Sequence, residues 1–512
     1  MSDTRTENVI KNSSATLLFK VVQIVSQFAL RTVFIYVLGR EYTGIQGLFT
    51  DILNVLSLME LGLDGSMVFS LYKPLAEGND KKVSAYVNFY RKAFGAIGVI
   101  VFLSGLICLP FLNYIITDAP DISENLNGIF MMYVITSASS YFLVYKTTLL
   151  QADQKARTVS LVSAAFQLVE GILEIIALAF FKAFYSYLIL HLIGTVGRNI
   201  VLSNMTNNRY RHILSDRESK LTREETKSLV IYIAALCVYN LSGVVINSTD
   251  SIFISAFVGT AEVAIIGNFT LIISNIRKLI QNIVKSTKPS VGNLAATSTV
   301  EKQKEIFSEM NFISFWVGCI CCSALFVLLN PFVGDIWFDS SYKTTLPILS
   351  VLVINFYIAV MVYPVETFRE GNGIVVQGWY RPLIMAILNI ALDFVMGKRW
   401  GVFGIFLATT ISRLLTQVWF DIYLLSKIIF HEFPGKYYVD YIFKMLLTIL
   451  SCAISYIVAS YSLGNVFFDF VSKIVIVLVV PNILIFIVYR KSKELQYLLK
   501  FAYKVMKRVT IF

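Results

Sequence analysis

Apolar stretches of nearly constant length repeat along the whole chain. About fourteen of them, each near twenty residues long, run from Leu17 to Val488 with short polar joints between them. Because the hydrocarbon core of a bilayer is about 30 Å thick, a helix needs roughly 20 apolar residues to cross it. The pattern therefore predicts an all-α integral membrane protein with about fourteen transmembrane helices. A mean hydropathy of +0.69 and a charged fraction of 15% exclude an ordinary soluble protein.

The expected spans divide into two groups at the longest joint on the inner side, which is polar throughout and separates six spans from eight. We expect the following parts: a first lobe (1–205), a cytoplasmic linker (206–228), a second lobe (229–430), two extra helices (431–489) and a basic amphipathic cytoplasmic tail (490–512). Transporters are often built from two repeats with the substrate site at their interface.

A short internal repeat supports this division. In each half a Phe-Ile pair precedes a glycine, and a Phe-Thr pair begins ten residues after that glycine. The glycines are Gly39 in the first half and Gly259 in the second, and a Lys-Pro pair closes the second span of each half, at Pro74 and Pro289. We interpret the match as a duplication.

The positive charge of the chain follows the expected topology. The net charge is +11. With the N-terminus inside, most Lys and Arg residues of the joints fall on the inner side, and the outer joints carry only Arg40, Lys182, Lys343, Lys398 and Arg399. This asymmetry predicts that both termini are cytoplasmic. Because the charge is explained by topology, we expect no nucleic-acid partner.

Catalytic and redox motifs fit the sequence poorly. The six cysteines lie in apolar spans without a Cys-x-x-Cys pair, so we expect small core residues and no metal or redox role. The chain has three histidines, and neither a His-x-x-x-His motif nor a P-loop is present. The longest outer joint, roughly Asn113 to Gly128, is too short for a catalytic domain. We therefore expect a protein that is not an enzyme.

Charged residues inside the first six spans point to a polar interior, because charge is costly in hydrocarbon and usually faces a cavity. Arg31 lies on one helical face with Gln23 and Gln27. Glu60 and Asp64 share a face of the second span near the middle of the bilayer, where they could form a proton or charge relay. An alternative is that such charges only hold the bundle together. We expect that structural role for Glu170, Glu174 and Lys146.

The span over residues 264–285 carries Arg277, Lys278 and Lys285 and no acid. Phosphate and diphosphate groups recruit the fork of Arg and the point charge of Lys. We therefore expect Arg31, Arg277 and Lys278 to bind an anionic head group. In the alternative, the two lysines extend to the inner surface, an interpretation that is strongest for Lys285.

Oxygen-bearing side chains recur in the second half at Asp250, Asn389, Asp393 and Thr409. Carboxylate, amide and hydroxyl oxygens are the ligands of hard cations. Asn389 and Asp393 are four residues apart and share a helical face. Spacing alone leaves two interpretations open, a coupling-ion site or a structural pair between Asp393 and Arg413.

Several segments resemble bacterial polysaccharide flippases, the Wzx-like branch of the multidrug/oligosaccharidyl-lipid/polysaccharide (MOP) exporter superfamily. The resemblance covers essentially the whole chain. It rests on the segments Gly39–Phe49, Glu60–Leu63, Leu71–Ala76, Ala152–Lys155, Asp250–Ser255 and Ser290–Leu294.

The resemblance implies two six-helix lobes in a pseudo-two-fold V around a central cationic cavity. It implies that undecaprenyl-diphosphate-linked oligosaccharide repeat units move from the inner to the outer leaflet of a bacterial plasma membrane, for capsule, exopolysaccharide or cell-wall polysaccharide. The movement would proceed by alternating access, driven by a cation gradient or the membrane potential. No cofactor is implied beyond a coupling ion, sodium or a proton. The protein is expected to act as a monomer, near polysaccharide polymerase machinery.

A sibling branch, the lipid II flippases, has a sodium site whose pattern matches five positions of this chain. These positions are Asp250, Asn389, Asp393, Ile405 and Thr409. The siblings also place a cavity arginine on the second span, where this chain is acidic. Arg277 with Lys278 is therefore our substitute for that group. The alternatives to a polysaccharide flippase are a cation-coupled multidrug exporter of the same superfamily and a lipid II flippase.

Overall fold

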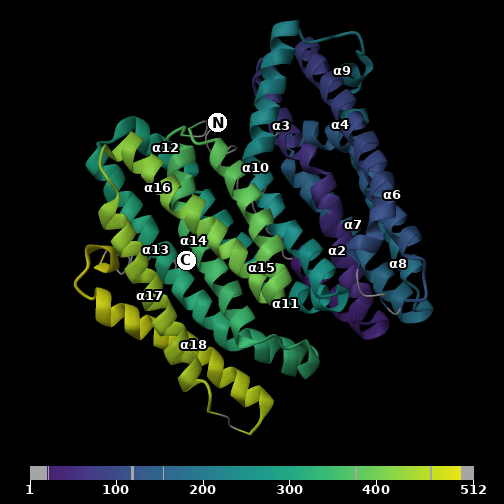
Figure 1. Ribbon diagram of the computed structural model, residues 1–512. Helices are drawn as coiled ribbons and strands as arrows, with labels where there is room; N and C mark the ends of the chain where they lie inside the picture. The colour runs from purple at the N-terminus through teal and green to yellow at the C-terminus, as the bar shows by residue number, and fades with distance from the viewer. Residues whose placement is uncertain are drawn as a thin grey trace, which may run out of the picture. The chain divides into compact units, whose positions relative to one another are not determined.

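The computed structural model describes residues 20, 22–116, 120, 122–153, 155–374, 377–461 and 464–496, and within these it is built of helices without a β-strand (Figure 1). Eleven helices in the described part are long and apolar enough to cross a membrane. The prediction of an all-α integral membrane protein is confirmed. Most of the predicted tail, residues 497–512, lies outside the described residues.

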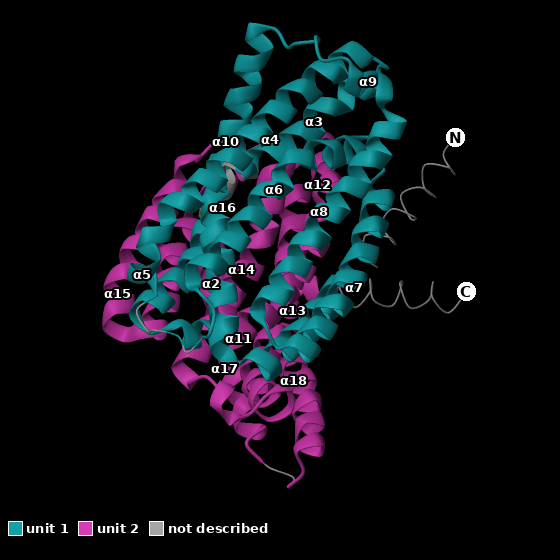
Figure 2. Cartoon of the chain, turned by 90° about the vertical axis from the view of Figure 1, so that its right-hand side faces the viewer, with its two compact units in different colours: residues 1–264 teal, residues 265–512 magenta. Residues whose placement is uncertain are grey.

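The chain forms two compact units, Met1–Ala264 and Ile265–Phe512 (Figure 2). Unit 1 begins with an apolar helix, Val22–Leu38. Its further helices are α2 (Arg40–Leu56), η1 (Leu58–Gly62), α3 (Leu63–Ala76), α4 (Asp80–Cys108), η2 (Leu109–Phe111), α5 (Leu112–Ile115), α6 (Leu126–Ala152), α7 (Ala156–Phe181), α8 (Phe184–Arg209), α9 (Arg211–Ser215), α10 (Arg223–Phe257) and the start of α11 (Thr260–Lys285).

Unit 2 continues from within α11. Its further helices are α12 (Lys288–Thr297), α13 (Val300–Pro331), η3 (Phe332–Trp337), η4 (Ser340–Tyr342), α14 (Leu346–Gly371), α15 (Tyr380–Arg413), η5 (Leu414–Val418), α16 (Trp419–Leu425), η6 (Ser426–Phe430), α17 (Gly435–Val458) and α18 (Val466–Tyr489). The continuous helical segment Tyr380–Phe430 contains two of the predicted spans, and the backbone leaves the helical region between them at Gly401 (φ 56°).

The division into compact units falls later in the chain than the predicted linker. Residues 206–228 hold the end of α8, the short α9 and the start of α10, which begins at a capping box between Thr222 and Glu225. α10 packs on α2 and η1, so a division by compactness counts this helix with unit 1. The boundary between two functional lobes, and the V around a cavity, stay predictions.

The glycines of the internal repeat occupy equivalent places in the helical order. Gly39 (φ 92°) joins the helix Val22–Leu38 to α2, and Gly259 (φ 133°) joins α10 to α11. Each glycine N–H donates a 3.0 Å hydrogen bond to a carbonyl of the preceding helix, Ile35 and Ile254 respectively. A positive φ is strained for residues with a Cβ, so both joints require glycine.

The second predicted span, near residues 48–71, is a broken helix. α2 and α3 are separated by the 3₁₀ turn η1, which holds Glu60. Gly62 at the end of η1 lies against α10, and a Cβ on this residue would be 2.3 Å from the Ile233 carbonyl oxygen. A 3₁₀ segment within a helix often marks a hinge or a functional position.

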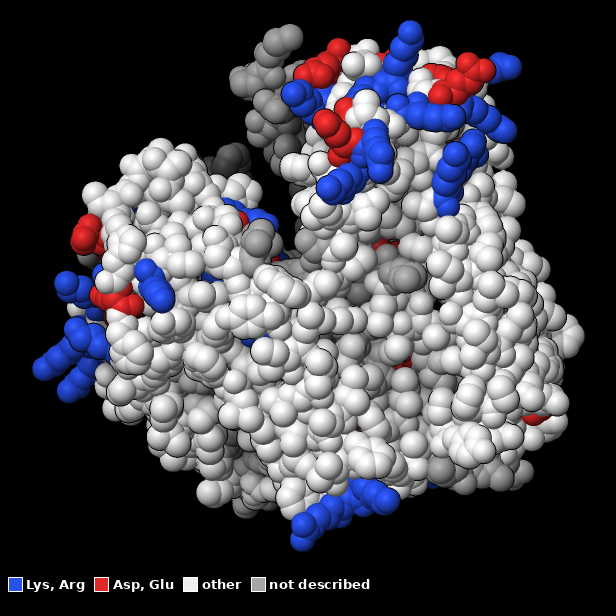
Figure 3. All heavy atoms as spheres, turned by 45° about the horizontal axis from the view of Figure 1, so that its top comes forward, with Lys and Arg blue, Asp and Glu red and all other residues white. Residues whose placement is uncertain are grey.

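Charged side chains gather at one end of unit 1, over the region of α9, while the helix surfaces beyond it are largely without charge (Figure 3). The residues of the predicted linker contribute exposed bases to this end: Arg211, Arg217, Lys220, Arg223 and Lys227. A strongly charged end next to helix surfaces that are largely uncharged on the face in view is the pattern of a membrane protein whose charged end lies in water.

Candidate functional site

Three of the predicted cation ligands converge inside unit 2. Asn389 and Asp393 lie on the first half of α15, and Thr409 lies on the second half, beyond Gly401. The Asn389 Nδ2 donates hydrogen bonds of 3.3 Å to Asp393 Oδ1 and of 3.3 Å to Thr409 Oγ1. All three side chains are buried. The turn of the backbone at Gly401 thus brings together groups that lie far apart along the sequence.

The oxygens of this cluster suit a hard cation. Asn389 Oδ1 is buried and accepts no hydrogen bond from the residues that the structure describes. A buried polar atom without a partner is costly, and a bound cation would satisfy it. Ile405, the predicted carbonyl ligand, is buried one helical turn before Thr409. The chemistry of these side chains suits a sodium ion, which Asn389, Asp393 and Thr409 would hold through oxygen atoms once the Asn389 amide had turned, and the site itself stays a prediction.

Asp250, the fifth predicted ligand, lies on α10 in unit 1 and is buried. Its part in the cation site stays a prediction. Arg413, the alternative partner of Asp393, donates through Nη1 to the Asn355 carbonyl at 3.3 Å. The choice between a coupling-ion site and a structural pair also stays open.

The predicted head-group residues belong to both units. Arg31 is part-buried in unit 1 and donates through Nη2 to the Ala264 carbonyl at 3.1 Å. Arg277 and Lys278 lie on the unit 2 part of α11, where Arg277 is half-buried and Lys278 is exposed. A combined role of the three residues stays a prediction.

Glu60 and Asp64 both accept hydrogen bonds from α6. The Tyr141 hydroxyl donates to Glu60 Oε2 at 2.6 Å, and the Thr148 hydroxyl donates to Asp64 Oδ1 at 2.7 Å. The two carboxyl groups thus face one helix. Their role as a relay stays a prediction.

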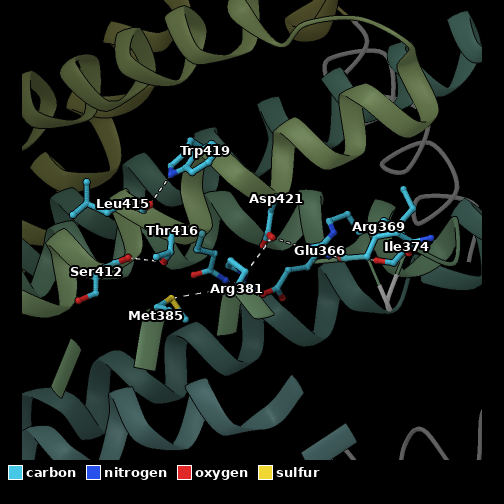
Figure 4. A network of polar contacts seen from close by, with 12 residues as sticks. Glu366, Arg369, Ile374, Arg381, Met385, Ser412, Leu415, Thr416, Trp419 and Asp421 are labelled. Atoms are coloured by element: carbon cyan, nitrogen blue, oxygen red, sulfur yellow. Dashed lines mark hydrogen bonds and ion pairs between the residues drawn. The ribbon is translucent and has the colours of Figure 1, made fainter. Parts of the chain in front are cut away.

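A buried charged network in unit 2 was missed by the sequence analysis (Figure 4). Asp421 on α16 pairs with Arg369 on α14 and, at 3.3 Å, with Arg381 at the start of α15. Arg369 Nη2 also donates to the carbonyls of Gln377, at 3.0 Å, and Ile374, at 3.4 Å. One carboxylate therefore joins the ends of three helices.

Lys285 extends this polar region through ion pairs, and its extension to the inner surface stays a prediction. Its Nζ lies 3.4 Å from Glu366 and 3.7 Å from Glu370, and Lys288 pairs with Glu370 at 2.8 Å. Gln417 donates to Glu366 at 3.1 Å. Opposite charges on neighbouring helix ends are close enough to hold the lysine, so it acts as a cross-link.

The signal for this network was present in the sequence. Asp421 is an acid within an expected span, and Glu366, Arg369 and Glu370 share a helical face at spacings of three and four residues. Their partners come from helices that are separate in sequence. The spacing therefore indicated a charged face but not the groups that neutralise it.

Comparisons with known proteins show which solved structures share this fold. No protein-family model and no curated protein sequence matches the chain. Among solved structures, the lipid II flippase MurJ in an inward closed conformation matches with a TM-score of 0.66 and 15% identity, over 94% of this chain and 99% of that chain. An inward-facing multidrug resistance MATE family transporter of the MOP superfamily matches with a TM-score of 0.56 and 14% identity, over 82% and 99%. An outward-facing multidrug resistance MATE family transporter matches with a TM-score of 0.53 and 12% identity, over 80% of this chain and 92% of that chain.

The chain is therefore a multi-pass membrane protein with the fold shared by MurJ and the MATE transporters. The resemblance to the MOP superfamily that the sequence motifs indicated is confirmed at the level of the fold. Sequence identities this low establish a shared fold but not a shared substrate, because the substrate depends on the residues of the site.

Proposed function

We propose that the protein translocates polyprenyl-diphosphate-linked oligosaccharide repeat units across a bacterial plasma membrane, for capsule, exopolysaccharide or cell-wall polysaccharide. The observation that carries the proposal is the similarity to a lipid II flippase over 94% of this chain and 99% of the flippase. Lipid II is a lipid-linked substrate. A protein that shares this fold along its whole length is suited to a substrate of the same general construction.

The basic residues supply the reason for an anionic head group. Arg31 lies within the apolar helix Val22–Leu38. Arg277 and Lys278 lie in a helical segment that is long and apolar enough to cross a membrane. A cation in hydrocarbon costs free energy, so it is expected where it meets an anion or water. A diphosphate offers several oxygens to Arg forks and Lys ammonium groups. The head group would be neutralised during passage while the lipid tail stays in the bilayer.

Coupling to a cation gradient is supported by the Asn389, Asp393 and Thr409 cluster. The Asn389 amide nitrogen lies 3.3 Å from one oxygen of each partner. Rotation of this amide would present its oxygen to the same space, where Asp393 supplies the negative charge. A sodium ion would be held there, with the Ile405 carbonyl and Asp250 as further predicted ligands. A ligand can shift a conformational equilibrium only by its difference in affinity for the two states.

The test is leaflet transfer of a polyprenyl-diphosphate-linked glycan in vesicles that contain the purified protein. We expect transfer by the native chain, and its loss in an Arg31→Ala, Arg277→Ala double variant. The matched control removes two exposed bases of the linker, Arg217→Ala and Arg223→Ala, and should keep transfer. Transfer by the first double variant at the native rate would contradict the head-group proposal.

The same vesicles separate the proposal from its main alternative. A cation-coupled multidrug exporter, which the MATE similarity favours, would move a cationic dye or drug against its gradient and leave the lipid-linked glycan in place. A lipid II flippase would move the lipid-linked muropeptide in preference to an oligosaccharide. Activity on the drug alone would replace the flippase proposal by the exporter.

A further inference from the structure

Two acids and the histidine next to them form a compact cluster inside unit 1. Glu170 and Glu174 are one turn apart on α7, and His191 lies on the neighbouring helix α8. The His191 Nδ1 lies 2.7 Å from Glu170 Oε1 and 3.4 Å from Glu174 Oε1. One donor atom from each residue falls within 4.8 Å of the others. Three groups of ligand type thus converge from two adjacent helices.

The surrounding residues shape this cluster. Gly194, one turn after His191, leaves the space that Glu170 fills, since a Cβ at Gly194 would lie 2.4 Å from Glu170 Oε2. The Tyr187 ring stacks on the His191 imidazole, with centroids 5.9 Å apart and planes 10° apart. The Tyr187 hydroxyl in turn accepts a 2.8 Å hydrogen bond from Gln46. These contacts restrict the positions of the Glu170 carboxylate and of the His191 ring.

Internal hydrogen bonding leaves the cluster incomplete. The Glu174 side chain is only 4% exposed, and its Oε1 accepts no hydrogen bond from the residues that the structure describes. The reason is geometric: Nδ1 carries a single hydrogen, and the shorter contact directs it to Glu170. A buried carboxylate oxygen that receives no hydrogen bond lowers the stability of the fold unless another group, such as a cation, satisfies it.

We propose that Glu170, Glu174 and His191 bind a divalent transition-metal ion of the zinc, cobalt or manganese class. Two carboxylates and one imidazole are a ligand set for these ions, whereas sodium and magnesium favour oxygen ligands alone. Binding would release the Nδ1 proton to solvent, because the metal takes the lone pair that the proton occupies. The dication would then neutralise both carboxylates. The His191 side chain is 38% exposed, so the cluster is open on one side to an entering ion.

The site is independent of the flippase proposal, because it lies within unit 1 and shares no residue with the predicted head-group or sodium sites. Its test uses the full chain, purified in detergent without a histidine tag and freed of metal. Cobalt(II) is added while its visible absorption spectrum and the release of protons are recorded. We expect saturation at one cobalt per chain with about one proton released, and displacement of the cobalt by zinc.

Variants of the cluster decide between a metal site and an ion pair. Glu174→Gln and His191→Gln should each weaken cobalt binding by at least about tenfold, since loss of even an outer partner costs that much. Gly194→Ala should also weaken it, by displacing Glu170. The matched control His212→Gln, His431→Gln leaves His191 as the only histidine of the chain and should bind cobalt like the native protein.

A folding defect is distinguished by the metal-free state. Each variant is compared in monodispersity and thermal midpoint before cobalt is added, and a native-like variant that has lost cobalt binding supports the site. Saturable binding that is unchanged in both Glu174→Gln and His191→Gln would overturn it. The absence of saturable cobalt or zinc binding by the native chain would also overturn it and leave a purely structural ion pair.

Discussion

The Tyr141 hydroxyl on α6 donates a 2.6 Å hydrogen bond to Glu60, which lies in the 3₁₀ turn that breaks the second span. This contact holds the turn against a continuous helix. We expect Tyr141→Phe to lower the free energy of unfolding by about 1.5–3 kcal/mol, the range for hydrogen bonds to charged groups.

The measurement is the unfolding midpoint of the purified protein in detergent. Tyr145→Phe is the matched control on the same helix, because the Tyr145 hydroxyl has no hydrogen-bond partner among the described residues. Its midpoint should stay close to the native value. Equal midpoints for the two variants would show that the contact with Glu60 does not stabilise the turn.

The Asn389, Asp393 and Thr409 cluster predicts stabilisation by sodium. An ion that binds only the folded state stabilises it by about 2.7 kcal/mol at one hundred times its dissociation constant. We expect sodium, relative to potassium or choline at equal ionic strength, to raise the thermal midpoint of the native chain. Asp393→Asn should abolish the difference.

The control for this experiment is Asp335→Asn, which removes the carboxylate in η3 that pairs with Lys343 at 2.7 Å. It should retain the sodium effect. A native chain that responds equally to sodium and potassium would count against a sodium site at Asn389 and Asp393.

The network at Asp421 predicts a large loss of stability. Asp421→Asn leaves the guanidinium groups of Arg369 and Arg381 buried without their carboxylate. Breaking a buried pair by removal of one partner costs about 3–5 kcal/mol. The variant should unfold at a much lower temperature, or fail to accumulate in the membrane.

An exposed pair on α13 is the control for the buried one. Lys302 and Glu305 are 2.7 Å apart, and both side chains are more than half exposed. Exposed pairs contribute little, so Glu305→Gln should change stability by about 0.5 kcal/mol or less. A similar small effect for Asp421→Asn would mean that the network is solvated and not structural.

The packing of Gly44 predicts opposite outcomes for two glycine replacements. A Cβ on Gly44 in α2 would lie 1.9 Å from the Thr260 carbonyl oxygen, so Gly44→Ala must push the two backbones apart. Gly65 in α3 has nothing within 4 Å of its Cβ position. Gly65→Ala should stabilise the helix by up to about 1 kcal/mol, and Gly44→Ala should be strongly destabilising. Thermal midpoints of the two variants, measured side by side, test the close approach.

The helical spans could be predicted from the sequence because each depends on a local property. An apolar run of about twenty residues crosses a bilayer whatever its neighbours are, and the turns at Gly39 and Gly259 need only their own backbone. The spacing of Glu60 and Asp64 predicted a shared face but not the helix that they contact. Even the break at η1 has a local component, since it ends at a glycine.

The partners of the charged groups could not be predicted from local sequence properties. Nothing in the sequence indicated that Glu366 and Glu370, from another helix, would lie within 4 Å of Lys285. Asp421 gave no indication that two arginines from α14 and α15 would converge on it. Glu170 and Glu174 were expected to have only a structural role in the bundle, and the incomplete hydrogen bonding at Glu174 appears only when α7 and α8 lie side by side.

By itself, then, the sequence determined that this chain is a helical membrane protein, where most of its helices run, and which superfamily its motifs resemble. These features depend on hydrophobicity and backbone geometry, which act over a few turns of chain. The tertiary structure decided which charges meet, which oxygens converge at Asn389 and which carboxylate is left incomplete. Those outcomes depend on the packing of helices that are remote in sequence, and spacing along one helix carries no information about its neighbour.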